Sequence, residues 1–295
     1  MELVSVVIPS YNHANFIVKT LESVLNQTHK SIQLIIVDDG STDDSEFVIS
    51  QFLIKHHVEN VLFLKQKNMG VSEAINTGIL RSSGKYIFLL ASDDIINPWA
   101  IKGMLEKFDR PEVGMVYGDA SFIDAQSNSM SIPLTSSRST KSFLEWRLQN
   151  APFSPLKNLD VRRCLFDRNF IPPMIMLKKD VVIKVGMFDA SLKLEDHEMW
   201  LRISRKYKII CFESIIGKYR IHGLNTILKS HRILFRDTIS ILLAEREHVK
   251  NTDDLFLLNK RILRLICSYV KNYKFSALME DQVTKWLKEF CKHLT

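Results

Sequence analysis

Short hydrophobic runs alternate with amphipathic segments through the first 120 residues of the chain. Five of the runs have the length and β-branched character of buried strands, at 4–8, 34–37, 61–64, 86–90 and 114–118. Between the runs, apolar residues recur at helical spacing, most clearly over 16–25 and 71–80. Strands that alternate with helices of this length predict right-handed βαβ units and a mostly parallel sheet flanked by helices.

The second half of the chain has a less regular pattern. A polar stretch from 121 to about 155 is rich in Ser, Thr, Asn and Gln and predicts a long loop. Long loops in compact domains usually serve a function, so we expect this one to lie on the substrate side. Two more strands are predicted at 174–177 and 209–212, with a helix over 192–207 between them, and a helix beginning at 97–98 is predicted earlier in the chain.

Beyond about residue 225 only helical periodicity remains, and this part of the chain is basic. The 295-residue chain has a formal net charge of +7, and residues 226–295 contain 13 Lys/Arg against 8 Asp/Glu. We therefore predict an α/β domain over 1–225 and a basic helical extension over 226–295. Such an extension can meet anionic lipid, nucleic acid or an acidic partner, or it can be an ordinary solvated surface. Its basic residues form no recognisable nucleic-acid-binding module, so we expect no nucleic acid partner.

The overall composition is that of a globular protein, with 46% hydrophobic and 25% charged residues. No apolar run approaches the roughly 20 residues that a membrane span needs. The N-terminus enters a strand pattern at once, so we expect no signal peptide. The four cysteines are far apart and lack metal-binding spacing, which is typical of thiols in a reducing compartment. We expect a cytoplasmic protein.

Pairs of aspartates follow two of the predicted strands. Asp38 and Asp39 come directly after the second strand, and Asp93 and Asp94 follow the fourth. Open α/β sheets bind ligands beyond the carboxyl ends of their strands. Hard cations bridge carboxylates to phosphates, so one pair suits a nucleoside and the other a metal-bound diphosphate. The alternative is that both pairs are turn and helix-cap residues.

The order and spacing of eight motifs resemble family 2 glycosyltransferases of the GT-A fold. Over about residues 3–225 the matching segments are VSVVIPSYN (4–12), SVLNQT (23–28), VDDGSTD (37–43), NxGVSxAxN (68–76), GKY (84–86), SDDxxxP (92–98), EDxxxWLR (195–202) and YRIH (219–222). The resemblance implies a Rossmann-like α/β sheet. It also implies an inverting, metal-dependent transfer of a sugar, of the hexosyltransferase type, from a UDP-sugar to an acceptor hydroxyl.

The resemblance assigns a nucleotide site to the N-terminal motifs. Asp39 is expected to accept a hydrogen bond from the uracil, with Pro9 and Tyr11 packed around the base. Further nucleotide contacts are expected from three residues, Asn76, Asp93 and Arg220.

The resemblance also implies a bound Mn²⁺ or Mg²⁺. Asp94 is expected to be the direct ligand, with Asp93 at the metal or the ribose. His222 is either a further ligand, since neutral imidazole commonly binds metals, or an ordinary surface histidine. The alternative for the two aspartates is a cap on the helix that follows them.

The late ED motif is expected to supply the base of the reaction. An acceptor hydroxyl is a poor nucleophile unless a base takes its proton, and the resemblance gives this role to Asp196. Glu195 would orient Asp196 or contact the acceptor. Trp200 is expected to be a core anchor and Arg202 a salt-bridge partner. The alternative for Asp196 is a carboxylate that stabilises the start of a helix.

Two positions depart from the family pattern. Many relatives have an aspartate at the position of Ala91 and an arginine at the position of Ile75. These departures leave open a second hypothesis, a non-catalytic protein that binds sugar nucleotides or acts as a scaffold on the same fold. For the enzyme, the resemblance favours a lipid-linked saccharide acceptor in bacterial surface-polysaccharide biosynthesis. The basic extension would then hold the protein peripherally at the inner face of the cell membrane.

Overall fold

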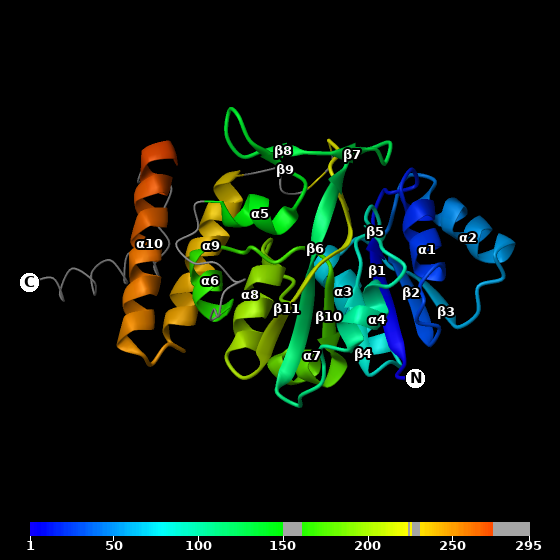
Figure 1. Ribbon diagram of the computed structural model, residues 1–295, viewed down its shortest axis with the longest axis horizontal. Coiled ribbons are helices and arrows are strands. Elements are labelled where there is room, and N and C mark those ends of the chain that lie inside the picture. Colours follow the sequence, from blue (N-terminus) through cyan, green and yellow to red (C-terminus); the bar gives the residue numbers. More distant parts are fainter. Residues whose placement is uncertain (150–160, 224, 226–230, 274–295) are drawn as a thin grey trace, which may run out of the picture.

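A nine-stranded mixed sheet forms the centre of the molecule in the computed structural model, which describes residues 1–149, 161–223, 225 and 231–273 (Figure 1). In spatial order the strands are β3 (Val61–Lys65), β2 (Ile32–Asp38), β1 (Val4–Ser10), β4 (Tyr86–Leu89), β10 (Ile175–Lys178), β6 (Val113–Ile123), β11 (Lys208–Arg220) and β5 (Ile95–Ile96), with β7 (Ser129–Met130) paired to β6. A small second sheet joins β8 (Ile132–Pro133) to β9 (Ser139–Thr140).

Strand direction determines where the ends of the strands meet. β3, β2, β1 and β4 are parallel to one another, and β6 is parallel to β11. β10 is antiparallel to both of its neighbours, so β4 and β6 point the same way. The prediction of a mostly parallel sheet is confirmed. The carboxyl ends of β1, β2, β4 and β11 therefore lie on one edge of the sheet.

Alternating residues of the strands face two separate cores. Val6 and Ile8 of β1 belong to the core covered by α1 (Ile17–Leu25), α2 (Ser45–Lys55) and α4 (Ala100–Leu105). Val7 of the same strand faces the other core. The helices that contribute to that core include α3 (Val71–Arg81), α6 (Val161–Asp167), α7 (Lys179–Val185), α8 (Glu195–Ser204), α9 (His231–Arg246) and α10 (Thr252–Tyr273). The sheet is therefore sandwiched between two helical layers, as the GT-A resemblance implies.

The region between β6 and β10 contains more structure than its polar sequence predicts. β6 continues to Ile123, and the segment that follows contains β7, β8, β9 and the helix α5 (Phe143–Leu148). Ser142 caps α5 by accepting a hydrogen bond from the backbone N–H of Glu145. Residues 150–160, the end of the predicted loop, lie outside the described part of the chain.

β11 is also longer than the predicted four-residue strand. It pairs with β6 along most of its 13 residues, with register shifts between Phe212 and Gly217. These irregularities interrupt the alternation of polar and apolar residues, which is why the pattern indicated only a short strand. The helix predicted at 97–98 begins at Ala100 instead, after the edge strand β5 (Ile95–Ile96) and a turn at 98–99.

The predicted C-terminal helices are present as α9 and α10, which lie side by side at one end of the molecule (Figure 1). Leu242 and Ile262 share one hydrophobic core with Trp200 of α8. The carboxylate of Glu245, which is 1% exposed, is ion-paired with Arg162 and Arg205. The core is thus continuous across residue 225, and the domain boundary proposed there stays a prediction.

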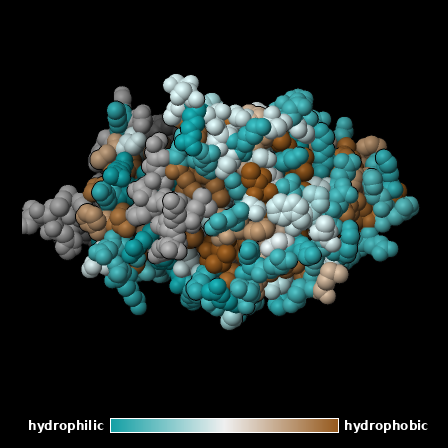
Figure 2. Space-filling model, viewed as in Figure 1, coloured by the Kyte–Doolittle hydropathy of each residue, from teal (hydrophilic) through white to brown (hydrophobic). Residues whose placement is uncertain are grey.

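The described surface is a mixture of hydrophilic and hydrophobic residues (Figure 2). On α2, Phe47 and Ile54 are exposed beside the exposed polar residues Glu46, Gln51 and Lys55. Exposed apolar side chains of this kind are common on folded proteins. Among the described residues, no helix combines the length and apolar composition needed to cross a bilayer.

Candidate functional site

The turn after β2 contains the first aspartate pair, and Asp38 stabilises the turn itself. Its carboxylate accepts hydrogen bonds from the backbone N–H and the hydroxyl of Ser41. Gly40 follows with φ of +72°, and a Cβ there would lie 2.8 Å from the backbone nitrogen of Asn68. Only glycine combines this backbone conformation with such a close approach. The turn therefore packs directly against the loop between β3 and α3.

Asp39 holds that loop in place. Its Oδ1 accepts hydrogen bonds from Gln66 Nε2 at 2.8 Å and Met69 N at 2.9 Å, and its Oδ2 accepts one from Gly70 N at 2.8 Å. The backbone N–H of Asp39 donates to the Ser10 carbonyl at the end of β1. Asp39 is therefore next to the Pro9–Tyr11 segment. The contacts with Gln66 and Met69 were not anticipated from the sequence.

The second aspartate pair places a carboxylate beside two imidazoles. Asp93 Oδ2 lies 2.8 Å from His222 Nε2, and both side chains are buried. A ring nitrogen of His13, one of His222 and a carboxylate oxygen of Asp93 all lie within 4.8 Å of one another. Burial lowers the pKa of His13, although the Asp93 charge opposes this shift. A neutral imidazole is the form that binds a metal.

His13 was missed by the sequence analysis. It directly follows the first motif, and its position in a loop between β1 and α1 gave no sign of a partner 80 residues away. The structure links its Nδ1 to Ser92 Oγ at 2.7 Å. A histidine at the carboxyl end of a strand, on the edge predicted to bind ligands, was the available signal.

Asp94 is turned away from this group. It is fully buried, and its Oδ1 accepts a hydrogen bond from the backbone N–H of Arg220 at 2.9 Å. Its Oδ2 has no hydrogen-bond partner among the described residues. Burial, and then the charge of Asp93, raise the pKa of Asp94 well above its usual range. In this conformation the carboxylate next to the imidazoles is that of Asp93.

Arg220 lies behind the aspartate pair and is 1% exposed. Its guanidinium donates to the carbonyls of Asp93 and Asp124 and to the hydroxyl of Ser127. It also lies over the ring of Phe16, 5.2 Å from the centroid. These contacts tie the end of β11 to the turn after β4, so the side chain supports the site from within.

Asn76 of α3 contacts backbone rather than the aspartates. Its Nδ2 donates to the Phe188 carbonyl at 2.8 Å, and its Oδ1 accepts from the Phe188 N–H at 3.0 Å. Both polar atoms of the amide are therefore used to hold the segment before α8 against α3.

The ED motif begins helix α8. Asp196 Oδ2 accepts a hydrogen bond from Asn169 Nδ2 at 2.7 Å, and its Oδ1 accepts one from the backbone of His197. Trp200 is buried against Phe188, as expected for a core anchor. Arg202 makes the predicted kind of salt bridge, with Glu198 at 2.6 Å.

Glu195 shares a low-dielectric environment with Asp196. Burial, and then the charge of Asp196, raise the pKa of Glu195 from 4.5 to about 8. Glu195 therefore carries a proton at neutral pH. A proton on Glu195 removes the repulsion between its carboxylate and the charge of Asp196.

Arg147 and Tyr219 connect this pair electrostatically to the aspartate pair. Burial lowers the pKa of Arg147, whereas the charge of Asp196 raises it. Burial also raises the pKa of Tyr219, with further increases from Asp94 and Asp93 and a decrease from Arg147. Arg147 also donates to the carbonyl of Asn169. Asp93, Asp94 and Asp196 therefore all affect the pKa values of this linked pair, Arg147 and Tyr219.

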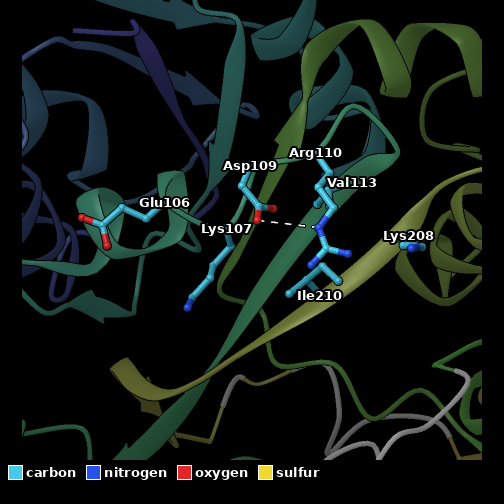
Figure 3. A pocket seen from close by; sticks show the side chains of 7 residues that line it. All are labelled: Glu106, Lys107, Asp109, Arg110, Val113, Lys208 and Ile210. Atoms are coloured by element: carbon cyan, nitrogen blue, oxygen red, sulfur yellow. Dashed lines mark ion pairs between the residues drawn. The ribbon is translucent and has the colours of Figure 1, made fainter.

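A small surface pocket lies at the opposite edge of the sheet, where β6 and β11 begin (Figure 3). It is lined by Glu106, Lys107, Asp109, Arg110, Val113, Lys208 and Ile210. Asp109 and Arg110 form an ion pair there at 3.7 Å, and the lining mixes both charges. Because ligands of open α/β sheets bind at the carboxyl edge, this pocket is not the candidate site.

The sequence profile described as glycosyl transferase family 2 matches residues 5–186, which is more than half of the chain. The chain belongs to this family. An uncharacterized glycosyltransferase of Rickettsia prowazekii is 29% identical over 291 residues, covering 95% of this chain and 85% of the relative. The chondroitin synthase of Escherichia coli is 28% identical over 94% of this chain and 34% of its own length. The protein is therefore a glycosyltransferase.

Solved structures agree with the GT-A fold of this glycosyltransferase. Staphylococcus aureus TarS, solved in complex with UDP, matches with a TM-score of 0.64 at 16% identity and covers 96% of this chain and 78% of TarS. The mannosyltransferase PcManGT of Pyrobaculum calidifontis, solved with GDP-Man and Mn²⁺, matches with a TM-score of 0.65 at 12% identity. That match covers all of this chain and 81% of the mannosyltransferase.

Proposed function

We propose that this glycosyltransferase moves a sugar from a UDP-sugar to an acceptor hydroxyl, with inversion, at the carboxyl edge of its sheet. One observation carries the proposal: Asp39 and Asp93 lie at the ends of the two strands that flank β1, and His222 lies beside Asp93. The ends of β2 and β4 are two strand spacings apart, which is roughly 10 Å. This arrangement suits a ligand with a base at one end and a diphosphate at the other.

Asp39 would recognise the uracil. A carboxylate offers about four lone-pair sites, and the loop at 66–70 uses three of them in this structure. The remaining site can accept the imide N–H of uracil. Tyr11, which is 44% exposed, would border the base, with Pro9 beneath it. The fold neighbour TarS, solved with UDP and with UDP-GlcNAc, supports a uridine donor.

Asp93 and His222 would hold a divalent ion, Mn²⁺ or Mg²⁺. Asp93 supplies an oxygen donor and His222 a nitrogen donor, and the buried Oδ2 of Asp94 is a further oxygen without a protein partner in the described chain. When bound, the ion would neutralise charge on the leaving diphosphate. The family resemblance favours Asp94 as the direct ligand, whereas this conformation favours Asp93. We therefore propose Asp93 as the first ligand.

Asn76 and Arg220 were predicted to contact the nucleotide, and we now propose supporting roles for both. Asn76 uses its amide on the backbone of Phe188, and Arg220 uses its guanidinium behind the turn at Asp93. Each residue would act on the donor through the segment that it holds.

Asp196 would take the proton from the acceptor hydroxyl as the new bond forms. Asn169 donates to one of its oxygens and so limits the rotation of the carboxylate. Glu195, protonated at neutral pH, would leave the negative charge on Asp196. Transfer would pass through a transition state with oxocarbenium character, as in other glycosyl chemistry.

For the acceptor we propose a lipid-linked saccharide in surface-polysaccharide synthesis. The chondroitin synthase relative is named for making a polysaccharide, which supports this class of product.

The basic extension, with 13 Lys/Arg against 8 Asp/Glu, would hold the enzyme peripherally at an anionic membrane. Each basic residue near such a surface contributes on the order of 1 kcal/mol. Co-sedimentation with anionic but not neutral vesicles, reversed by high salt, is the expected result. Equal binding to both vesicle types, or none, would argue against it.

Thermal unfolding in the presence of a panel of UDP-sugars tests the donor. A bound donor raises the unfolding temperature by mass action, so at least one UDP-sugar should do so in the presence of Mn²⁺. GDP-mannose is the matched control, because the neighbour PcManGT was solved with it. Stabilisation by GDP-mannose alone would overturn the uridine assignment.

The alternative function is a scaffold that binds sugar nucleotides. It is suggested by the two departures from the family pattern, Ala91 and Ile75. Ile75 is 7% exposed and part of a core, so its side chain serves packing in this structure. Slow metal-dependent hydrolysis of the preferred UDP-sugar without acceptor separates the two functions. Binding without any hydrolysis or transfer would favour the scaffold.

A further inference from the structure

We propose that His13 is a third metal ligand, and that the His13–Asp93–His222 group binds a transition-metal ion in preference to Mg²⁺ before any nucleotide is present. The inference rests on the proposed metal site but not on the transfer reaction. Direct metal binding tests this inference. If His13 proves not to bind a metal, the proposed sugar transfer still stands, and if the protein proves not to transfer a sugar, the metal-binding inference still stands.

The three donors come from three distant parts of the chain. His13 lies in the loop after β1, Asp93 in the turn after β4, and His222 just beyond β11. Their ligand atoms lie within 4.8 Å of one another in the protein as folded. Asp93 is 7% and His222 9% exposed, and His13 is partly buried. Only small side-chain shifts would bring the three donors around one ion.

The imidazoles are held in place by contacts of their own. Ser92 Oγ lies 2.7 Å from His13 Nδ1. The Phe16 ring packs against both histidines, with centroid distances of 5.7 Å to His13 and 4.7 Å to His222. The backbone N–H of His222 donates to Asn225 Oδ1 at 2.6 Å. A histidine that binds a metal usually engages its other ring nitrogen in a hydrogen bond, which fixes the orientation of the ring, and the contact of His13 Nδ1 with Ser92 Oγ is of this kind.

The donor set determines which ions are favoured. Two imidazole nitrogens and one carboxylate oxygen suit Mn²⁺, Co²⁺ or Zn²⁺, whereas Mg²⁺ prefers oxygen ligands and gives up water reluctantly. For divalent ions at one site, affinity rises from Mn²⁺ to Co²⁺. We therefore expect the order Co²⁺, Mn²⁺, Mg²⁺ from tightest to weakest. The competing interpretation is that the Asp93–His222 contact is an ordinary hydrogen bond that binds no ion.

Calorimetry on the full chain without nucleotide tests the selection directly. CoCl₂, MnCl₂ and MgCl₂ are titrated separately. One site per chain is expected for Co²⁺ and Mn²⁺, with Mn²⁺ bound at least about tenfold more tightly than Mg²⁺. The visible absorption of bound Co²⁺ should indicate nitrogen ligation. Equal affinity for Mn²⁺ and Mg²⁺ would overturn the proposal, and this measurement needs no variant.

Two variants at one position test the role of His13. His13→Gln should weaken Co²⁺ binding at least about tenfold. Loss of a residue that only supports a metal ligand already costs about tenfold or more in affinity, so loss of a direct ligand should cost at least as much. His13→Asp replaces a nitrogen donor by an oxygen donor, so it should narrow the ratio of Mn²⁺ to Mg²⁺ affinity. His56→Gln removes an exposed imidazole just after α2 and should change neither the Co²⁺ affinity nor the ratio of Mn²⁺ to Mg²⁺ affinity. Unchanged Co²⁺ affinity and spectrum in a folded His13→Gln protein would overturn the assignment.

Discussion

Asp93–Asp94 and Glu195–Asp196 are both pairs of adjacent carboxyl residues, but their surroundings differ. In each pair, burial raises the pKa of one member, Asp94 or Glu195. The other member is the one with a polar side-chain partner. Asp93 meets the imidazole of His222, whereas Asp196 meets the amide of Asn169.

The difference in partners indicates the difference in chemistry. An imidazole beside a carboxylate offers two kinds of metal donor at one point. An amide N–H that holds a carboxylate leaves its other lone pairs to accept a proton. Adjacent carboxyl groups therefore do not identify a metal site or a base by themselves. The third residue, from a distant part of the chain, makes the distinction.

The largest effect is expected at the proposed base. Asp196→Asn should lower turnover by roughly 10²–10⁴, the usual contribution of a general base, because the amide cannot take the acceptor proton. UDP affinity in calorimetry should be nearly unchanged. Glu198→Gln, the same chemical change two residues along α8, is the matched control. A near-normal rate for Asp196→Asn would remove Asp196 from the reaction.

The next largest effect should separate the members of the first pair. Asp93→Asn should remove the metal-dependent part of UDP affinity, a loss of roughly tenfold to a hundredfold. Asp94→Asn should lose less, since the buried Oδ2 has no partner and the amide oxygen can still accept from Arg220 N. Calorimetry with UDP, with and without Mn²⁺, provides the comparison. A greater loss in Asp94→Asn would restore the ligand order that the family resemblance favours.

A smaller effect is expected from the residue that positions Asp196. Asn169→Leu keeps nearly the same size but removes the hydrogen bond at 2.7 Å. Hydrogen bonds to charged groups contribute about 1.5–3 kcal/mol, so kcat should fall by at least roughly tenfold. Because the base itself remains, the KM for the donor should not change, and the pH profile of kcat should shift. A drop in donor affinity with an unaltered pH profile would instead indicate a purely structural role.

The last prediction concerns the pH dependence of stability. The folded pKa of Glu195 is about 8, against 4.5 for a free glutamate, so between these values the folded state holds a proton that the unfolded chain has released. Stability should therefore fall as pH rises through this window, by at most about 1.4 kcal/mol per pH unit. Urea unfolding of the parent and of Glu195→Gln at about pH 6 and pH 8 measures this. Equal slopes in both proteins would show that Glu195 does not hold the proton.

Local sequence patterns were enough to predict the alternation of strands and helices, the mostly parallel sheet and the family. They also placed Asp39 and Asp93 after strands and Asp196 at the start of a helix. These features depend on local periodicity and motif spacing, which a single chain displays directly. Helices α9 and α10 were predictable for the same reason.

Contacts between distant side chains could not be predicted from the sequence, because they form only in the folded chain. His13 and Asp93 are 80 residues apart, and Asn169 reaches Asp196 from outside the motif, so no local pattern contains these contacts. The length of β11 was also a tertiary outcome, because its irregular register is stabilised by pairing with β6. The raised pKa of Glu195 could not be predicted either, because it depends on burial and on the charge of Asp196, and the chain buries this group only when it folds.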